Sequence, residues 1–516
     1  MLAGFASGQV LTHGPVVGGV TDTDARVFVR TDQVATVEVH YGTDPNLGTY
    51  LTSEAFDTDP ASDFTEVIPL ADLTAETIYY LDVAVNGVPQ FAVPYPSFTT
   101  FPPSGSSRNF TFLVLSDFTT TRSLPGPSQT FASAAAKNPA FAFIGGDFDH
   151  RNPKSLADKR SMFHDLYNPN TLYFGDFVNL ILRKMPIMHQ WDDHDSGVNN
   201  LDKSYPDWNL SQQAFQENVP SYPFPSVTPG IWQKFSYAQA DCFVLDCRSQ
   251  RSPENNPDGP TKSMLDGNFL GATGELQWLQ DGLLASTARW KIIFTSVVTN
   301  PTTKFPDGWA GYQTEWNALK DFINTNQIQG IVFIAGDLHL GAIDNGTASG
   351  FPEMCVSQAN GVGGCPTGPY GIWSEGYYRD DTCKGFNLVT VTTDPDQLIL
   401  QVMDEFGNTK ISYTLSDQTP TPTPTPTPAP PVITVQPGDR IAKVGRKAKF
   451  SVTATGTPPL LYQWEKNGTN ITGATGTNYN TPPVTAADNG ALFSVVVSDI
   501  GGSVTSNNAK LTVRLQ

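Results

Sequence analysis

Several short apolar runs in the middle of the chain end in acidic residues and histidines. One of them, Met185 to Trp191, is followed directly by Asp192, Asp193, His194 and Asp195. Short apolar runs that stop at turn or polar residues are typical of buried strands. The same pattern recurs at 110–115 before Asp117, at 141–144 before Gly146-Asp147-Phe148-Asp149-His150, and at 331–335 before Gly336-Asp337-Leu338-His339. Because open α/β sheets bind ligands at the carboxyl ends of their strands, we expect these carboxylates and imidazoles to share one crevice that suits a metal ion.

The stretch from Phe110 to about Leu415 alternates strand-like runs with helical patterns, which predicts an α/β domain. Its strands are expected at 110–115, 141–144, 186–190, 242–245, 291–295 and 331–335. Helices are expected at 274–284, with Thr273 as the N-cap, and at 314–323. Two late strands, 388–392 and 398–402, are expected to close the domain.

The N-terminal part of the chain predicts a small β-sandwich over residues 11–101. The runs 25–30, 35–41 and 78–85 alternate apolar with polar residues, and turn-forming residues separate them. This pattern resembles a fibronectin-III-type module. Pro and Gly residues at 102–105 then mark a boundary.

A Thr-Pro repeat separates the end of the chain from the rest. Residues 419–427 alternate Thr and Pro, so they cannot form a packed core and are expected to be an extended spacer. Residues 432–516 resemble an immunoglobulin-like domain with Trp464 as its core tryptophan. No cysteine lies in this part, so the usual inter-sheet disulfide is missing, and Phe493 stands where that family has a tyrosine.

The predicted organisation therefore has four parts. A fibronectin-III-like β-sandwich takes residues 1–104, an α/β core 105–417, a Thr-Pro linker 418–431 and an immunoglobulin-like β-sandwich 432–516. This agrees with the two to four domains that a chain of 516 residues is expected to hold.

Composition narrows the range of partners. The 31 Lys and Arg against 50 Asp and Glu give a formal charge of −19, which argues against a nucleic-acid binder or a binder of anionic membranes. The five cysteines lack a C-x-x-C pair, so no zinc ribbon is predicted, while Cys365 and Cys383 are candidates for a disulfide. No run approaches 18 apolar residues, and no signal peptide is recognisable in this sequence.

The acidic blocks carry a resemblance to a known family. Their order, with Asp117, Gly146-Asp147, Trp191-Asp192-Asp193-His194-Asp195 and Gly336-Asp337-Leu338-His339, resembles the signature of calcineurin-like metallophosphoesterases. The forms of the last two blocks are similar to the PhoD-like alkaline phosphatase branch, and supporting segments follow at 245–251, 262–265 and 277–279. The resemblance covers about residues 8–402 and implies a four-layer α/β/β/α sandwich for the core.

The resemblance also implies a site for two or more divalent or trivalent metal ions. It makes Asp147 the bridge between two ions, and it makes His194 the histidine that contacts the substrate. The other implied ligands are Asp117 and His339 for the first ion, and Asp193 and Asp337 for the second. Carboxylates where common members of the family have Asn and His shift the donor set towards oxygen, which favours calcium, iron or manganese over zinc.

The sequence departs from the family pattern at two places. Thr119 stands where a histidine is usual, and the segment 292–300 lacks the middle histidine of the family. Candidates for a missing ligand, or for a group that supports the ligands, are Asp149, His150, Ser296 and Asn300. Candidates for gripping phosphate oxygens are Arg151, Arg248 and Arg251, with Lys154 and Lys262 as further basic residues.

The function implied is a secreted, cell-surface or periplasmic phosphoric ester hydrolase of the PhoD-like type. Two metal ions would activate a water to attack a phosphate ester, with Asp147, Asp193 and His194 as catalytic residues. The C-terminal module would attach the protein to a cell surface or polymer. Two alternatives stay open: a phosphodiesterase acting on phospholipid, nucleotide or teichoic-acid-like substrates, and a non-catalytic surface-binding or adhesion protein.

Overall fold

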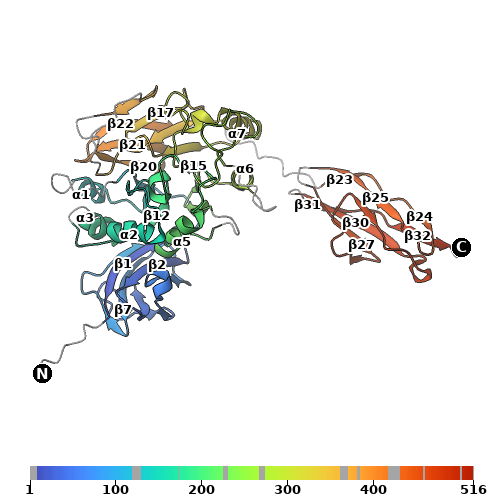
Figure 1. Cartoon of the computed structure of the whole chain (residues 1–516), viewed down its shortest axis with the longest axis horizontal. Helices are drawn as coiled ribbons and strands as arrows, with labels where there is room; N and C mark the ends of the chain where they lie inside the picture. The colour runs from blue at the N-terminus through green and yellow to red at the C-terminus, as the bar shows by residue number, and fades with distance from the viewer. Residues whose placement is uncertain are drawn as a thin grey trace. The chain divides into compact units, whose positions relative to one another are not determined.

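Internal contacts divide the chain into two compact units, Met1–Asp417 and Gln418–Gln516 (Figure 1). The computed structural model describes residues 9–118, 129–171, 174–224, 230–265, 274–360, 370–379, 384–416, 431–456, 460–499 and 502–514. Thr119, Thr273, Cys365, Cys383 and the Thr-Pro repeat lie outside the described residues. The predicted boundary near residue 104 falls inside the first unit.

Two large sheets form most of the first unit. Within the described residues, the first sheet has nine strands in the order β22 (Thr409–Ser416), β21 (Asp396–Asp404), β20 (Gly385–Thr393), β10 (Phe110–Leu115), β11 (Ala142–Gly145), β12 (Ile187–Gln190), β1 (Leu11–Gly18), β2 (Ala25–Thr31) and β6 (Thr65–Leu70). The second has seven, in the order β13 (Gln233–Tyr237), β14 (Ala240–Val244), β15 (Trp290–Thr295), β16 (Ile331–Ala335), β18 (Pro352–Cys355), β17 (Gly341–Asn345) and β19 (Gly376–Tyr378). Each sheet contains a parallel block, β10-β11-β12 in the first and β14-β15-β16 in the second.

Alternating side chains on these strands separate the core into layers, because successive residues of a strand point to opposite faces. Phe143 of β11 and Phe294 of β15 stack between the sheets, with ring centroids 3.7 Å apart. The outer face of the first sheet packs on α1 (Thr130–Ala135), α2 (Leu156–Leu166), α3 (Gly175–Phe177) and its π-helical continuation (Val178–Leu182), and α5 (Trp208–Asn218). The outer face of the second sheet packs on α6 (Glu275–Ala285) and α7 (Gln313–Thr325). This confirms the predicted α/β/β/α sandwich.

The predicted strands and helices of this core are found close to their expected positions. The runs 110–115 and 331–335 coincide with β10 and β16, and the other four predicted strands match β11, β12, β14 and β15 within two residues at each end. The helices expected at 274–284 and 314–323 are α6 and α7. Short, mostly apolar runs were informative here because these strands are almost entirely buried on both faces.

The N-terminal strands are joined to the core by backbone pairing. Gly18 of β1 pairs in parallel with Ile187 of β12, so β1, β2 and β6 extend the first sheet. A smaller sheet packs behind them, with β4 (Leu51–Thr52), β3 (Thr36–Gly42), β7 (Ile78–Val85) and β8 (Val88–Pro89) in order, and β5 (Phe56–Asp57) and β9 (Ser97–Thr99) at its sides. The predicted β-rich character of this part is observed, and one apolar core continues from it into the space between the large sheets.

The second unit is a β-sandwich built around Trp464. Its described strands are β23 (Val432–Val435), β24 (Arg440–Lys443), β25 (Lys449–Ser451), β26 (Thr453–Thr455), β27 (Leu461–Lys466), β28 (Thr469–Asn470), β29 (Asn478–Asn480), β30 (Leu492–Asp499), β31 (Gly502–Thr505) and β32 (Ala509–Arg514). Trp464 is fully buried, and its indole N–H donates to the carbonyl of Gly476 at 2.9 Å. Phe450 and Phe493 stack beside it, so aromatic packing fills the centre of this sandwich.

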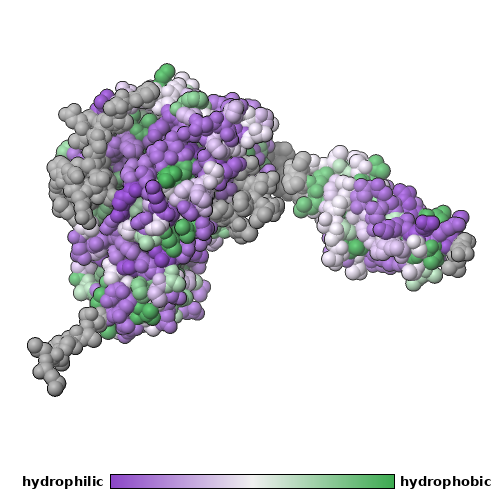
Figure 2. Space-filling model, viewed as in Figure 1, coloured by the Kyte–Doolittle hydropathy of each residue, from purple (hydrophilic) through white to green (hydrophobic). Residues whose placement is uncertain are grey.

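The face seen in Figure 2 is mostly hydrophilic, with separate apolar spots on both units. Scattered exposed apolar residues of this kind are normal on a folded surface. Among the described residues, no helix has the length and apolar character needed to cross a membrane.

Because the two units are separately compact, removal of the second should leave the first intact. We expect a chain that ends at Asp417 to hydrolyse a small soluble phosphate ester within about twofold of the full chain, since changes remote from a site are usually worth less than about 0.5 kcal/mol. Steady-state kinetics of both forms measure this. A loss of most of the activity on truncation would show that the second unit completes the site.

Candidate metal centre

The acidic blocks of the sequence meet at the carboxyl ends of the parallel strands. Asp117 follows β10, Asp147 follows β11, Asp192 and Asp193 follow β12, and Asp337 and His339 follow β16 of the other sheet. Their carboxylate and imidazole atoms form groups in which all members lie within 4.8 Å of one another. The predicted convergence of these blocks is therefore observed.

Four of these residues have a left-handed backbone. The φ angle is 53° at Asp117, 51° at Asp147, 66° at Asp337 and 55° at His339. Residues other than glycine adopt this conformation rarely, and strained backbone positions cost about 1–3 kcal/mol each. Such positions cluster at functional sites, where the turn aims a side chain at the expense of stability.

The glycine before two of the aspartates allows the turns to approach each other. A side chain on Gly146, whose φ is 92°, would place its Cβ 2.8 Å from Cβ of Asp192, and one on Gly336 would place it 2.8 Å from Oγ of Ser116. Both distances are too short for carbon contacts. The Gly-Asp pairs of the sequence therefore have a steric reason, because only glycine lets the strand ends meet here.

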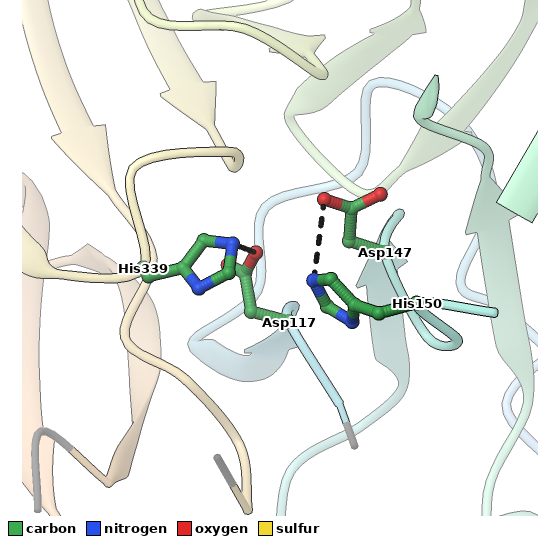
Figure 3. A group of neighbouring side chains, drawn as sticks. All are labelled: Asp117, Asp147, His150 and His339. Atoms are coloured by element: carbon green, nitrogen blue, oxygen red, sulfur yellow. Dashed lines mark ion pairs between the residues drawn. The ribbon is translucent and has the colours of Figure 1, made fainter. Parts of the chain in front are cut away.

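The first group of donors contains Asp117, Asp147, His150 and His339 (Figure 3). Nε2 of His339 lies 3.2 Å from Oδ1 of Asp117, and Nε2 of His150 lies 3.7 Å from Oδ2 of Asp147. The two carboxylates are buried, whereas the imidazoles are partly exposed. One side of this group therefore remains open to an approaching ligand.

His150 is arranged as a metal-binding histidine is expected to be. Its Nδ1 donates to the carbonyl of Phe118 at 3.1 Å, which leaves the lone pair of Nε2 directed towards Asp147. Histidine ligands of metals usually donate their second ring nitrogen to a carbonyl or carboxylate in this way. Burial, followed by the nearby His339 and His194, lowers the pKa of His150 to about 3, so the ring is neutral and able to coordinate.

Asp147 lies at the centre of the cluster. It belongs to the first group, to a second with Asp193 and His194, and to a third with Asp192, Asp193 and Asp337. A single carboxylate shared by adjacent groups is the arrangement that a bridging ligand needs. Asp147 is therefore common to all three groups, and the bridging role that the resemblance implies for it stays a prediction.

Several buried carboxylate oxygens of the cluster accept no hydrogen bond from the described residues. Among the described residues, none donates a hydrogen bond to Oδ1 and Oδ2 of Asp117, Oδ2 of Asp147, Oδ2 of Asp192, Oδ1 of Asp195 or Oδ2 of Asp337. Burial, and then the neighbouring carboxylates, raises the pKa of Asp147 well above its usual value. Burial likewise raises the pKa of Asp192 to about 7 despite the charge of Arg248. Cations coordinated by these oxygens would remove the repulsion, so the donor set fits metal ions that prefer oxygen.

Arg248 is a fully buried cation among these carboxylates. Its guanidinium donates to Asp192 through Nε and to Asp307 through Nη1 at 2.7 Å. Its Nη2 lies 3.6 Å from an oxygen of Asp193 and 3.6 Å from an oxygen of Asp337. In this structure Arg248 therefore holds the ligand carboxylates, and it is 0% exposed to an incoming phosphate.

Arg251 continues this buried network. Its Nη1 lies 2.7 Å from Oδ1 of Asp307, and its Nε donates to the carbonyl of Leu201. Although burial alone would raise it, the charges of Arg248, Arg251 and Lys304 hold the pKa of Asp307 well below its usual range. The network supplies fixed positive charge next to the acidic cluster.

His194 lies on the short helix α4 (Asp193–Ser196), beside Asp147. Its backbone N–H donates to Asp193 Oδ1 at 2.9 Å and lies 3.3 Å from Asp147 Oδ1, while its Nδ1 is 2.7 Å from Oδ1 of Asn152. Asp195 of the same helix accepts the backbone N–H groups of Asp147 and Asp192, each at 3.0 Å. The segment that begins with Asp192 therefore fixes the positions of both Asp147 and His194.

The remaining predicted site residues have other partners. Asp149 binds the backbone and side chain of Arg151, which also pairs with Asp165, and neither Asp149 nor Arg151 joins a donor group. Asn300 binds Thr302 and the carbonyl of Ile372 through its amide, while the backbone carbonyl of Ser296 accepts the N–H of Gly336.

The predicted basic residues also have partners or surroundings of their own. Lys262 donates to the carbonyl of Glu254, and Lys154 and Arg151 line a surface cavity of about 340 Å³ that also includes Asn152.

The structure adds residues to which the sequence gave no role. Lys304 donates to Asp337 at 2.9 Å and is about one-third exposed, Asp192 joins the third donor group, and Asp307 anchors both arginines. Asp192 stood inside a recognised block, so its position in the sequence was a signal for it. Lys304 and Asp307 come from a loop after β15 that carries no such pattern.

Glu353 of β18 is a buried carboxyl group beside this loop, and it predicts a pH dependence. Its Oε1 accepts the N–H of Thr299 at 2.6 Å, and burial raises its pKa to about 7. In the unfolded chain this carboxyl has a pKa of about 4.3 and loses its proton first, so the stability of the folded chain falls as the pH rises from about 4.3 to about 7.

We expect Glu353→Gln to be more stable than the wild type at pH 8, by up to about 3 kcal/mol, and equal at pH 4. Thermal unfolding at both pH values measures this, and parallel pH curves for the two proteins would contradict it.

Models of known families match three parts of the chain. Residues 176–354 match the model described as PhoD-like phosphatase, residues 430–498 match an immunoglobulin domain, and residues 8–105 match a domain of unknown function. Asp193, His194, Asp337 and His339 lie inside the phosphatase match, whereas Asp117 and Asp147 precede it.

Individual proteins that are similar to this chain include phosphatases. Alkaline phosphatase D of Bacillus subtilis (strain 168) is 29% identical over 183 residues, which are 30% of this chain and 31% of that relative, so the match spans about a third of its length. The solved structure of PhoD has a TM-score of 0.64 at 18% identity and covers 81% of this chain and 94% of that one. Purple acid phosphatase PPD1 from yellow lupin (Lupinus luteus) seeds has a TM-score of 0.54 at 15% identity, with 80% and 77% covered. At these identities the two structures show the fold.

The likeness to the two solved structures shows the fold of the first unit, whose clustered donors lie at the ends of its parallel strands. The matches to family models show a PhoD-like phosphatase domain and, after it, an immunoglobulin domain, as the sequence predicts.

Proposed function

We propose that the first unit is a metal-dependent phosphoric ester hydrolase, with Asp147 as the carboxylate that two metal ions would share. The observation that carries the proposal is the set of buried carboxylate oxygens around Asp147 that accept no hydrogen bond from the described residues. The relatives described as phosphatases supply the reaction class. Ions held there would provide a water nucleophile at neutral pH and neutralise charge on the phosphoryl group.

The side chains of this protein have distinct tasks in that reaction. Asp117, Asp147, His150 and His339 would hold the first ion, and Asp147, Asp193 and Asp337 the second. The ions would supply the attacking water, whose released proton passes to the solvent, while His194 would donate a proton to the ester oxygen as its bond to phosphorus breaks. Arg248 keeps two of these carboxylates in place throughout, because it contacts Asp193 and Asp337 as well as the neighbouring Asp192. The oxygen-rich donor set supports calcium, iron or manganese over zinc.

The experiment that tests the proposal is hydrolysis by the purified full chain after chelation and return of single metals. Calcium, manganese, ferric iron and zinc are added in turn, and a nitrophenyl monoester and a bis-nitrophenyl diester are compared. We expect metal-dependent release of nitrophenolate, and the ratio of the two rates distinguishes a phosphomonoesterase from a phosphodiesterase. Bound metal with no hydrolysis of either ester would overturn the enzymatic proposal in favour of a binding or adhesion protein.

We further propose that the protein works outside the cell, secreted, on the cell surface or in the periplasm, with the C-terminal unit as an attachment module. The Thr-Pro repeat of the sequence and the separate immunoglobulin domain support this, although the analogy is at the level of the fold. A pull-down of the isolated second unit with cell-wall material of a producing cell tests the attachment. Recovery no greater than that of an unrelated immunoglobulin domain would count against it.

A further inference from the structure

We propose that Asn152 is a positioning residue for His194, whose amide oxygen fixes the orientation and the tautomer of that imidazole. The inference deepens the proposed function and rests on it, because it gives His194 its role in proton transfer. It assigns a task to a residue that lies in the loop between Asp147 and α2, outside every donor group of the centre.

The contact itself is short and well placed. Oδ1 of Asn152 lies 2.7 Å from Nδ1 of His194. A carbonyl oxygen of an amide only accepts hydrogen bonds, so Nδ1 keeps its proton. The proton that the reaction uses is therefore carried by Nε2, the other ring nitrogen. Fixing one nitrogen of a catalytic histidine by a partner on the opposite side of the ring is a general way of setting its tautomer.

The backbone explains why an asparagine can stand at this position. Asn152 has a φ of 53°, a left-handed conformation that asparagine tolerates better than most residues. The turn that leads to it is formed by Asp149, whose carboxylate accepts the N–H of Arg151 at 2.8 Å. The pair of the buried Asp149 and the exposed Arg151 thus has a structural task, which is to position the amide of Asn152 next to His194.

A buried lysine joins the two segments that carry this pair. Nζ of Lys159, which is only 1% exposed, donates to the carbonyl of Ser196 and, at 3.4 Å, to that of Pro153. Ser196 ends the helix that begins with Asp193 and His194, and Pro153 follows Asn152. The hydrogen bonds of Lys159 therefore hold the segments of Asn152 and His194 together, which restricts rotation of the imidazole ring before any substrate binds.

The amide of Asn152 carries no charge, and this matters because His194 lies among carboxylates. The carboxylates of Asp147 and Asp193 already lie within 4.8 Å of an imidazole nitrogen of His194. A carboxylate at position 152 would orient the ring equally well but would add a further negative charge next to the incoming phosphate. An amide orients the imidazole without that repulsion, which distinguishes orientation from charge as the contribution of Asn152.

The test is a double-mutant cycle in the full chain. Asn152→Gly keeps the left-handed backbone and removes the amide, and Asn138→Gly is the matched control, because Asn138 also has a φ of 53° and lies beyond α1. We expect Asn152→Gly to lower kcat about 10- to 100-fold on an alkyl phosphate and much less on a nitrophenyl phosphate, with KM and metal content unchanged. The control should behave as the wild type.

In the second arm, Asn152→Gly is introduced into His194→Ala. If Asn152 acts through His194, this adds no further loss, whereas additive losses would overturn the proposal. A histidine-selective 15N NMR spectrum of the full chain, assigned by the signals that vanish in His194→Ala, should show the proton of neutral His194 on Nδ1. The opposite tautomer would also overturn it. This spectrum needs no turnover, so it decides the Asn152 contact even if the wild type hydrolyses no ester and the proposed function fails.

Discussion

Asp147→Asn should lose bound metal and phosphate-ester hydrolysis together. Asp147 is the carboxylate common to all three donor groups, and no described residue donates a hydrogen bond to its buried Oδ2. An asparagine keeps the size of the side chain but has one neutral oxygen, so it cannot bridge two cations. Removal of a group that only supports a ligand already costs about 10- to 100-fold in metal affinity or activity. We therefore expect a loss of activity greater than about 100-fold.

Elemental analysis of the purified variant, beside its kcat, measures this prediction. Asp281→Asn is a matched control, because Asp281 is an exposed carboxylate on α6, and it should keep both metal and activity. Full metal occupancy in Asp147→Asn would rule out the bridging role. Retained folding is checked by thermal unfolding, since the substitution also relieves repulsion among buried carboxylates and need not destabilise the chain.

His194→Ala should lower turnover strongly while the metal ions stay bound. The imidazole is held by Asn152 through Nδ1, and one of its nitrogens lies within 4.8 Å of oxygens of Asp147 and Asp193, next to the proposed metal site. A single general acid contributes about 10²- to 10⁴-fold to a rate, so a loss of that order in kcat is expected. Metal content should not change, because each ion keeps its carboxylate ligands.

The loss should depend on the leaving group. A nitrophenolate needs little protonation as it departs, so the effect of His194→Ala should be smaller for a nitrophenyl ester than for an alkyl ester. Kinetics on a series of esters with leaving groups of different basicity measure this dependence. Loss of metal from the variant would reassign His194 as a ligand, and equal losses on all esters would leave it a purely electrostatic role.

The strand-end positions of the site were predictable because they depend on local sequence. Buried parallel strands read as continuous apolar runs, and a Gly-Asp pair at the end of such a run signals a tight turn with an aimed carboxylate. The α/β character of the core followed from the same local signals, whereas its four-layer arrangement and the immunoglobulin domain were implied by resemblance to known families. The bridging role of Asp147 was also implied by resemblance and stays a prediction, although Asp147 belongs to all three donor groups.

Contacts between distant segments were beyond the sequence. A basic residue near the site predicts a phosphate contact as readily as an ion pair, and only the fold shows that Arg248 and Arg251 are buried on Asp192 and Asp307. The same holds for the sheet shared by β1 and β12, which lie about 170 residues apart.

The sequence by itself determined which residue types end the parallel strands, and hence that an acidic, metal-binding crevice would form. The tertiary structure decided which of these groups face one another, that the guanidinium of Arg248 lies among the carboxylates, and how His150 and His194 are oriented. The physical reason is that strand ends and turns are set by neighbouring residues, whereas burial, ion pairing and ring tautomers depend on side chains brought together from separate segments.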